Sequence, residues 1–188
     1  KNVYIQNNQK RKEDNTCRIN SENLENISKL IGWNAVKYAD LKHNRNNDYQ
    51  FDYQKMLDTK GDTLVYQLYS WVRLKNLFRK TDFDIKQIRE FNIVFSKINL
   101  EYKTERNLVL HLTQFDEIIR KVSDTLLPNY LCEYIYQMSI KINEFWRDCK
   151  VLNNENEKSR LKICLATKIT MKKCFDLLSI PVDQIERL

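Results

Sequence analysis

The chain has very few of the residues that form tight turns, with two glycines and two prolines in 188 residues. Glycine adopts the backbone conformations that phosphate-binding loops require, and two separated glycines cannot form a GxGxxG motif or a P-loop. A sequence with so few helix breakers also favours long helices. The scarcity therefore disfavours a nucleotide-binding loop in this chain and predicts a mainly α fold.

Cysteine and histidine show no pattern of a disulfide framework or a zinc site. The five cysteines are Cys17, Cys132, Cys149, Cys164 and Cys174. Their odd number and long spacings argue against both kinds of site, and the two histidines, His43 and His111, lie far from any cysteine cluster. We expect reduced, buried thiols in a cytoplasmic protein, and no metal site.

Long apolar segments are also lacking. No run could cross a bilayer, and the N-terminus has no apolar core of a signal peptide. The chain starts at Lys1 without a methionine, so we expect a piece of a longer polypeptide. The net charge of +7 favours an anionic partner, with nucleic acid ahead of a membrane surface. A solvated, lysine-rich surface without a specific partner explains the charge equally well.

The first sixty residues predict a mixture of elements. Residues 1–20 are polar and suit a mobile loop, and Ser21 can cap a helix that Gly32 ends. The alternation of side chains over residues 35–42 predicts a strand, which would be the last strand of a sheet formed mostly by upstream residues. Residues 43–61 form a polar connection whose apolar groups hold it to a neighbour.

Everything after Gly61 predicts helix. Asp62 or Thr63 can be the first N-cap, and Pro128 suits the first turn of a later helix. Apolar residues recur at helical spacing in the ranges 65–72, 85–95, 108–122, 131–145 and 161–178. Short connections make neighbouring helices pack antiparallel, so we expect a helical bundle, with Met138 and Met171 filling its core.

Basic and aromatic residues interleave in two places, one after Gly61 and one at the end of the 131–145 helix. The members are Tyr66, Tyr69, Trp71, Arg73 and Lys75 in the first place, and Trp146, Arg147 and Lys150 in the second. An aromatic ring beside guanidinium groups is a platform on which an unpaired base can stack. Core packing competes as an explanation, and we favour it for Tyr69 and Trp71. Trp146 is turned about 100° from the core residue Phe145, which favours the rim.

No nucleophile stands beside a recognisable base, and the carboxylates are scattered on helix faces within reach of Lys and Arg. The chain therefore suits a binding module or a structural arm. A helical protein-interaction module, or a general RNA-binding module without specificity for one kind of RNA, is the main alternative to a specific RNA-binding domain. A stand-alone enzyme would need a pocket with convergent ionisable groups, which the sequence does not offer.

From about Leu24 to Leu188 the chain resembles the C-terminal region of arginyl-tRNA synthetases, a class I family. The resemblance follows several motifs in the family's order, namely Trp33–Leu41 with Asn44-Arg45, Tyr49–Asp52, Gly61–Thr63 with Tyr69 and Arg73, Leu131–Tyr136, Phe145-Trp146 with Cys149, Ser159–Leu161, and Leu177 to Leu188. It implies a tail of an α/β catalytic domain and connecting loop over residues 1–58, then an α-helical anticodon-binding domain over residues 59–188.

The resemblance also implies a role. The family's helical domain grips the anticodon stem-loop of tRNA-Arg, so the chain would position this tRNA for ATP-dependent arginylation by an upstream catalytic domain. The implied tRNA-binding residues are Trp146, Leu188, Gly61, Asp62, Thr63, Tyr69 and Arg73, and the residues themselves add Arg147 and Lys150. The resemblance implies no catalytic residue, metal or cofactor in this chain, ATP and magnesium only in the full-length enzyme, a monomer, and no membrane partner.

Three departures from the family are notable. Leu188 stands where the family usually ends in methionine, and Trp146 replaces a tyrosine or phenylalanine. Ser179 stands where a helix-ending glycine is common, which argues against a left-handed residue there. The HIGH and KMSKS-like motifs would lie upstream, so we expect this chain alone to form no aminoacyl-tRNA.

Overall fold

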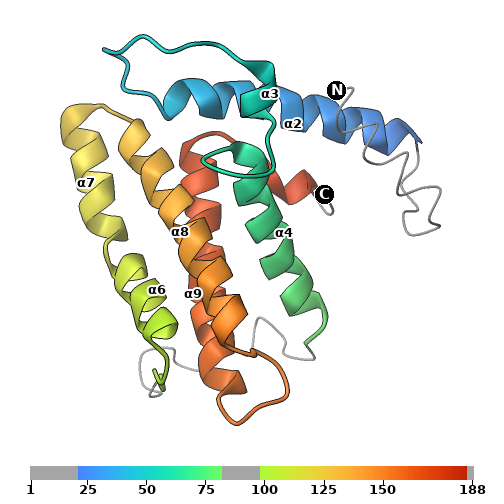
Figure 1. Cartoon of the computed structure of the whole chain (residues 1–188), viewed down its shortest axis with the longest axis vertical. Helices are drawn as coiled ribbons and strands as arrows, with labels where there is room; N and C mark the ends of the chain where they lie inside the picture. The colour runs from blue at the N-terminus through green and yellow to red at the C-terminus, as the bar shows by residue number, and fades with distance from the viewer. Residues whose placement is uncertain (1–20, 82–97, 186–188) are drawn as a thin grey trace.

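The regular elements of the chain are helices in a computed structural model that describes residues 21–81 and 98–185 (Figure 1). They are α2 (Ser21–Leu41), α3 (Tyr53–Met56), α4 (Leu64–Arg79), α6 (Lys103–Thr113), α7 (Phe115–Thr125), α8 (Asn129–Asp148), α9 (Glu157–Leu177) and the 3-10 turn η1 (Val182–Gln184). The mainly α class predicted from the sequence is confirmed.

Helix α8 lies at the centre of a bundle. It contacts α4, α6, α7 and α9, and α9 in turn contacts α4 and α6. Helix α8 runs opposite to α6, α7 and α9, as the predicted antiparallel packing requires (Figure 1). Its buried residues recur at intervals of three and four, and they are Leu131, Cys132, Tyr134, Ile135, Met138, Ser139, Ile142 and Phe145. Met138 and Met171 are both fully buried, which confirms them as core residues.

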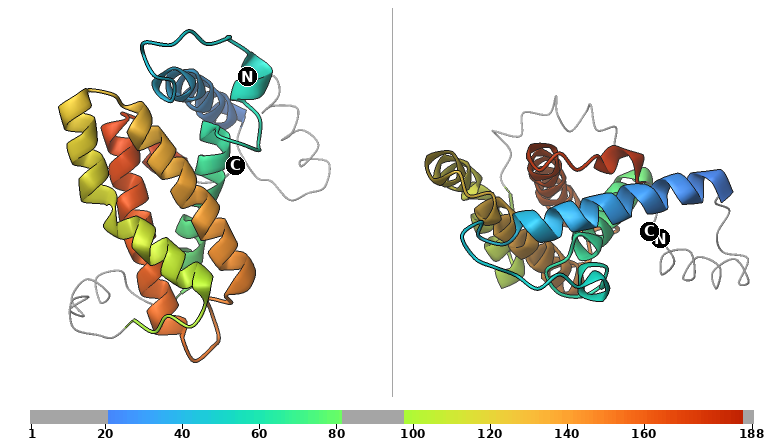
Figure 2. Two further views of the ribbon diagram at one scale, coloured as in Figure 1. Left: turned by 60° about the vertical axis from the view of Figure 1, so that its left-hand side comes forward. Right: turned by 90° about the horizontal axis from the view of Figure 1, so that it is seen from above.

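Helix α2 crosses one end of this bundle, where it contacts α4 and α8 (Figure 2). The strand predicted over residues 35–42 is wrong, as is the helix end at Gly32, because α2 continues through both. Ile31, Ala35, Tyr38 and Ala39 are all buried, and their spacing fits one face of a helix. Because two members of this stripe are small alanines, it is only slightly more apolar than the neighbouring residues, and the helical pattern is weak in the sequence. The alternation of side chains over residues 35–42 therefore does not reflect a strand.

The segment predicted as one helical repeat over residues 108–122 bends at Gln114, between α6 and α7. Just before the break, the His111 ring nitrogen Nε2 is 2.9 Å from the Tyr134 carbonyl oxygen, and the His111 carbonyl accepts the Tyr134 hydroxyl at 3.1 Å. These contacts fix the end of α6 on α8. The predicted loop over residues 1–20 and the helix predicted around residues 84–97 lie outside the described residues.

The tail after α9 begins with a left-handed residue. Ser179 has φ of 54°, and the Ile180 N–H donates to the Phe175 carbonyl at 2.8 Å, which is the closing bond of a Schellman motif. The expectation that serine would prevent this conformation is wrong, because the motif and the buried Ile180 hold it. Trp71 and Lys75 of α4 then donate to tail carbonyls at 3.3 and 3.1 Å.

Candidate nucleic-acid interface

Three of the predicted contact residues meet on the surface between α4 and α8. The guanidinium carbon of Arg73 lies 4.2 Å from the centre of the Trp146 ring and 5.8 Å from the centre of the Tyr69 ring. Both distances are within the range of a cation–π contact. Tyr69 is 54% exposed, so the core position favoured for it from the sequence is wrong, whereas Trp71 is buried as expected. We call Tyr69, Arg73 and Trp146 the platform.

A polar side chain of α8 fixes the guanidinium from below. Asn143 accepts a hydrogen bond from Arg73 at 3.1 Å through Oδ1. Its Nδ2 lies 3.0 Å from the Tyr66 hydroxyl, 3.1 Å from Ser70 Oγ and 2.8 Å from the Ser139 carbonyl. The bonds to Arg73, Tyr66 and Ser70 join α4 to α8 next to the platform. Asn143 was not singled out in the sequence, although a polar residue between Ile142 and Phe145 was a signal for it.

Trp146 is half-buried, as its position on the rim predicted. Its side chain interacts with the thiol of Cys164, a buried residue of α9. Burial raises the pKa of this thiol to about 12, so the thiol stays protonated. The indole therefore meets a core residue on one side, while Arg73 lies over a face of the ring.

The two basic residues that follow Trp146 have different surroundings. Arg147 is exposed, but its Nε donates to Asp148 at 2.8 Å, so its charge is largely balanced by a neighbour. Lys150 is exposed and lies beyond the end of α8, after Cys149 has turned to extended backbone with φ of −123° and ψ of 115°. Of the two, Lys150 is the better placed to meet a phosphate.

The turn of Gly61, Asp62 and Thr63 lies elsewhere. Gly61 is exposed and adopts φ of 78°, which suits a residue without a side chain. The carboxylate of Asp62 faces α2, where it accepts the Tyr38 hydroxyl at 2.7 Å and lies 3.7 Å from Lys42 Nζ. Burial raises the pKa of this carboxyl above its usual value. Gln67 Nε2 donates to the same Tyr38 hydroxyl.

Thr63 is buried and caps α4, since its Oγ1 accepts the Tyr66 N–H at 3.2 Å. The turn stands ten residues before Arg73 on the axis of α4, or roughly 15 Å at the helical rise. The structure thus brings Tyr69, Arg73 and Trp146 together and places the turn apart from them. Leu188, the other predicted partner of Trp146, lies outside the described residues.

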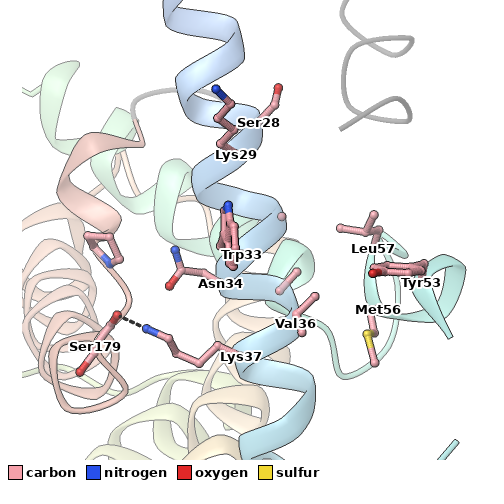
Figure 3. A pocket seen from close by; sticks show the side chains of 13 residues that line it. Ser28, Lys29, Trp33, Asn34, Val36, Lys37, Tyr53, Met56, Leu57 and Ser179 are labelled. Carbon is pink, nitrogen blue, oxygen red and sulfur yellow. Dashed lines mark hydrogen bonds between the residues drawn. The ribbon is translucent and has the colours of Figure 1, made fainter. Parts of the chain in front are cut away.

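A separate groove of about 860 Å³ lies along α2, between α3 and the tail (Figure 3). Trp33, which is 78% exposed, and Tyr53 line it, and Lys37 crosses toward the tail to donate to the Ser179 carbonyl at 2.9 Å. Its charged lining consists of Lys29 and Lys37. Among the residues that the structure describes, the lining of this groove includes no carboxylate.

Within residues 21–81 and 98–185, no three His, Cys, Asp or Glu side chains are arranged to hold a metal ion. The four cysteines in these ranges are buried free thiols, as predicted. No helix in the same part of the chain is long and apolar enough to span a membrane.

Known proteins are similar to this chain in sequence and in fold. The DALR anticodon binding domain family matches residues 67–184, and the catalytic domain family of class I (R) tRNA synthetases matches residues 4–53. The chain is 44% identical over 159 residues to the cytoplasmic arginine--tRNA ligase of Arabidopsis thaliana, covering 85% of this chain and 26% of the relative. It is 41% identical over 167 residues to the arginine--tRNA ligase of Rippkaea orientalis, covering 88% and 28%.

Solved structures agree. The arginyl-tRNA synthetase of Plasmodium falciparum superposes with a TM-score of 0.83 at 34% identity, over 100% of this chain and 32% of that one. The Thermus thermophilus arginyl-tRNA synthetase has a TM-score of 0.74 at 20% identity, over 94% and 29%, and shows the fold alone. The chain thus spans about a quarter to a third of the length of these proteins. Over the larger part of its length, the chain belongs to the DALR anticodon binding domain family.

Proposed function

We propose that this chain binds the anticodon stem-loop of tRNA-Arg and that the platform is the surface that contacts an unpaired base. The supporting observation is the guanidinium of Arg73, which lies 4.2 Å from the centre of the Trp146 ring, donates to Asn143 and is flanked by the exposed ring of Tyr69. A planar cation between aromatic rings offers a base both a stacking face and a positive charge. Single-stranded RNA is recognised through such contacts.

The remaining predicted residues have secondary roles in this proposal. Lys150 meets the phosphate backbone near the platform, and the exposed Gly61 allows a close approach of RNA backbone. Asp62 and Thr63 act by shaping the turn, since their side chains are engaged with Tyr38 and with the start of α4. Arg147 contributes less, because Asp148 balances its charge. Leu188 remains proposed as a second wall for the base.

The longer protein of which this chain forms a part is proposed to be an arginine-tRNA ligase. Its catalytic domain would hold ATP, magnesium and arginine, and this chain would deliver tRNA-Arg as a monomer. The two family matches end at residue 53 and begin at residue 67, which supports a domain boundary near residues 58–59. The buried free thiols support a cytoplasmic location.

A filter-binding titration with tRNA-Arg and an unrelated tRNA tests this proposal. Arg73→Ala should weaken binding of tRNA-Arg roughly 5- to 150-fold, which corresponds to about 1–3 kcal/mol per stacked base. Arg79→Ala is the matched control, because it removes the same charge from the same helix six residues away. Equal losses for the two variants, or equal affinity for both tRNAs, would contradict the proposal.

The groove beside Trp33 favours a second function, a protein-interaction surface. Trp33 and Tyr53 are large, exposed and apolar, and both lie within or at the edge of the catalytic-domain match. We propose that this surface packs against the rest of the catalytic domain in the longer protein. Trp33→Ser should then leave the tRNA affinity of this chain unchanged, whereas in the longer protein it should lower the thermal unfolding temperature. A loss of tRNA affinity would contradict this assignment.

A further inference from the structure

Arg160, near the start of α9, is a buried cation that is 5% exposed. Its Nε donates to Glu105 Oε1 at 2.7 Å, and Glu105 is itself fully buried. Burial alone would raise the pKa of Glu105, but the backbone N–H of Tyr102 and the Arg160 guanidinium hold it below its usual value. The pair is therefore charged and mutually neutralised, and Arg160 has no charge to offer a phosphate.

The guanidinium joins three segments that are distant in the sequence. The guanidinium holds Glu105, and Glu105 Oε2 accepts the backbone N–H groups of Glu101 and Tyr102 at 2.7 and 2.9 Å. These bonds fix the start of α6. Arg160 itself belongs to α9. Its Nη1 donates to the Lys150 carbonyl at 2.8 Å and lies 3.3 Å from Asn154 Oδ1, which fixes the loop after α8.

The Lys150 carbonyl is held from two sides, since Asn154 Nδ2 also donates to it at 2.5 Å. On the other side of Lys150, Cys149 is buried against Thr104, with 3.8 Å between Sγ and Oγ1. Helix geometry does not direct Lys150, because α8 has ended at Asp148. The direction in which its exposed side chain leaves the surface is therefore set by these anchors, four residues after Trp146.

We propose that Arg160 is a positioning residue for RNA binding, which acts through the carbonyl of Lys150 and aims the Lys150 ammonium at a phosphate beside the platform. This inference rests on the proposed function. Arg160 orders the loop that carries Lys150 and does not itself contact the RNA. Substitution of Arg160 should consequently lower the tRNA affinity only when the Lys150 side chain is present.

A double-mutant cycle in this chain tests the inference, with tRNA-Arg affinity measured between 50 and 200 mM salt. Arg160→Lys keeps a cation beside Glu105 but cannot also reach the Lys150 carbonyl. Each phosphate contact contributes roughly 0.7–0.9 to the salt slope, so its loss should reduce the affinity drop across this range about threefold. Arg160→Lys and Lys150→Ala should each give this change, and the double variant should give no more than Lys150→Ala.

Asn154→Ala is the second variant, since it loosens the same carbonyl and removes one contact of Arg160 Nη1, but keeps the bond between Arg160 Nε and Glu105. It should give the same reduced slope and the same lack of effect in the Lys150→Ala background. The inference is overturned if Arg160→Lys or Asn154→Ala weakens binding equally with and without the Lys150 side chain. It is also overturned if Lys150→Ala leaves the slope unchanged while Arg73→Ala still weakens binding. In that case the platform stands and only the role of Arg160 and Lys150 fails.

Discussion

The layering of Arg73 on Trp146 predicts how substitutions at these two residues combine. If a base stacks on the guanidinium, Trp146 acts through Arg73, because the indole fixes the plane on which the base lies. The contact at 4.2 Å is worth about 0.5–1 kcal/mol at an exposed site, and a stacked base about 1–3 kcal/mol. Trp146→Ala should therefore cost about 1–2 kcal/mol of tRNA affinity, or roughly 5- to 30-fold.

The double variant separates this layered arrangement from two independent contacts. In the layered arrangement, Arg73→Ala combined with Trp146→Ala should cost little more than Arg73→Ala alone, because the second change removes a support that is no longer used. Independent contacts would add within about 0.5 kcal/mol. Affinities come from filter binding at fixed salt, with circular dichroism checking the fold. Arg73→Lys, which keeps the charge without the plane, should preserve the salt slope yet lose affinity. Additive losses would refute the layering.

Three further predictions concern the stability of the fold. Tyr38→Phe removes the hydroxyl that donates to Asp62. It should lower the free energy of unfolding, measured by urea denaturation, by about 1–3 kcal/mol. A change within experimental error would show that this hydrogen bond does not stabilise the fold. Ser179→Gly should raise that free energy by about 0.5–1 kcal/mol, since glycine tolerates φ of 54°; a loss would show that the serine side chain stabilises the turn. Burial lowers the pKa of His111 below its usual 6.5, and the partners of Glu105 lower the pKa of that carboxyl below its usual 4.5. Near these pH values the unfolded chain therefore binds more protons than the folded chain. The free energy of unfolding should fall as the pH drops below 6.5, and fall again as it drops below 4.5. His111→Gln should abolish the first decrease in a pH series of urea titrations, and a decrease that persists would contradict its assignment to His111.

The helices of the bundle could be predicted because each has an apolar stripe with strong contrast, as in α8. Helix α2 could not, because Ala35 and Ala39 are small and the true stripe through Ile31 and Tyr38 was weaker than the accidental alternation beside it. Whether such a segment forms a helix or a strand depends on how much apolar area it buries, and for α2 that area depends on the helices it crosses.

The platform was partly visible in the sequence. The phase of Trp146 relative to Phe145 placed it at the rim, and the structure agrees. The neighbours of Tyr69 decided its exposure, and no local pattern reports them. The ion pair between Glu105 and Arg160 joins residues 55 positions apart, and a single sequence does not reveal a pairing across that separation. Contacts within one helix were predictable, whereas those between helices needed the packed bundle.

The three tryptophans offer the most direct test of the central claim that RNA binds at the platform. They occupy three environments, since Trp33 is exposed on α2, Trp71 is buried against the tail, and Trp146 lies under Arg73. Fluorine NMR of the chain labelled with fluorotryptophan resolves them, with assignment by Trp33→Phe and Trp71→Phe. Titration with the anticodon stem-loop of tRNA-Arg should shift the Trp146 resonance and leave that of Trp33 in place. A shift of Trp33 with an unmoved Trp146 would contradict the account.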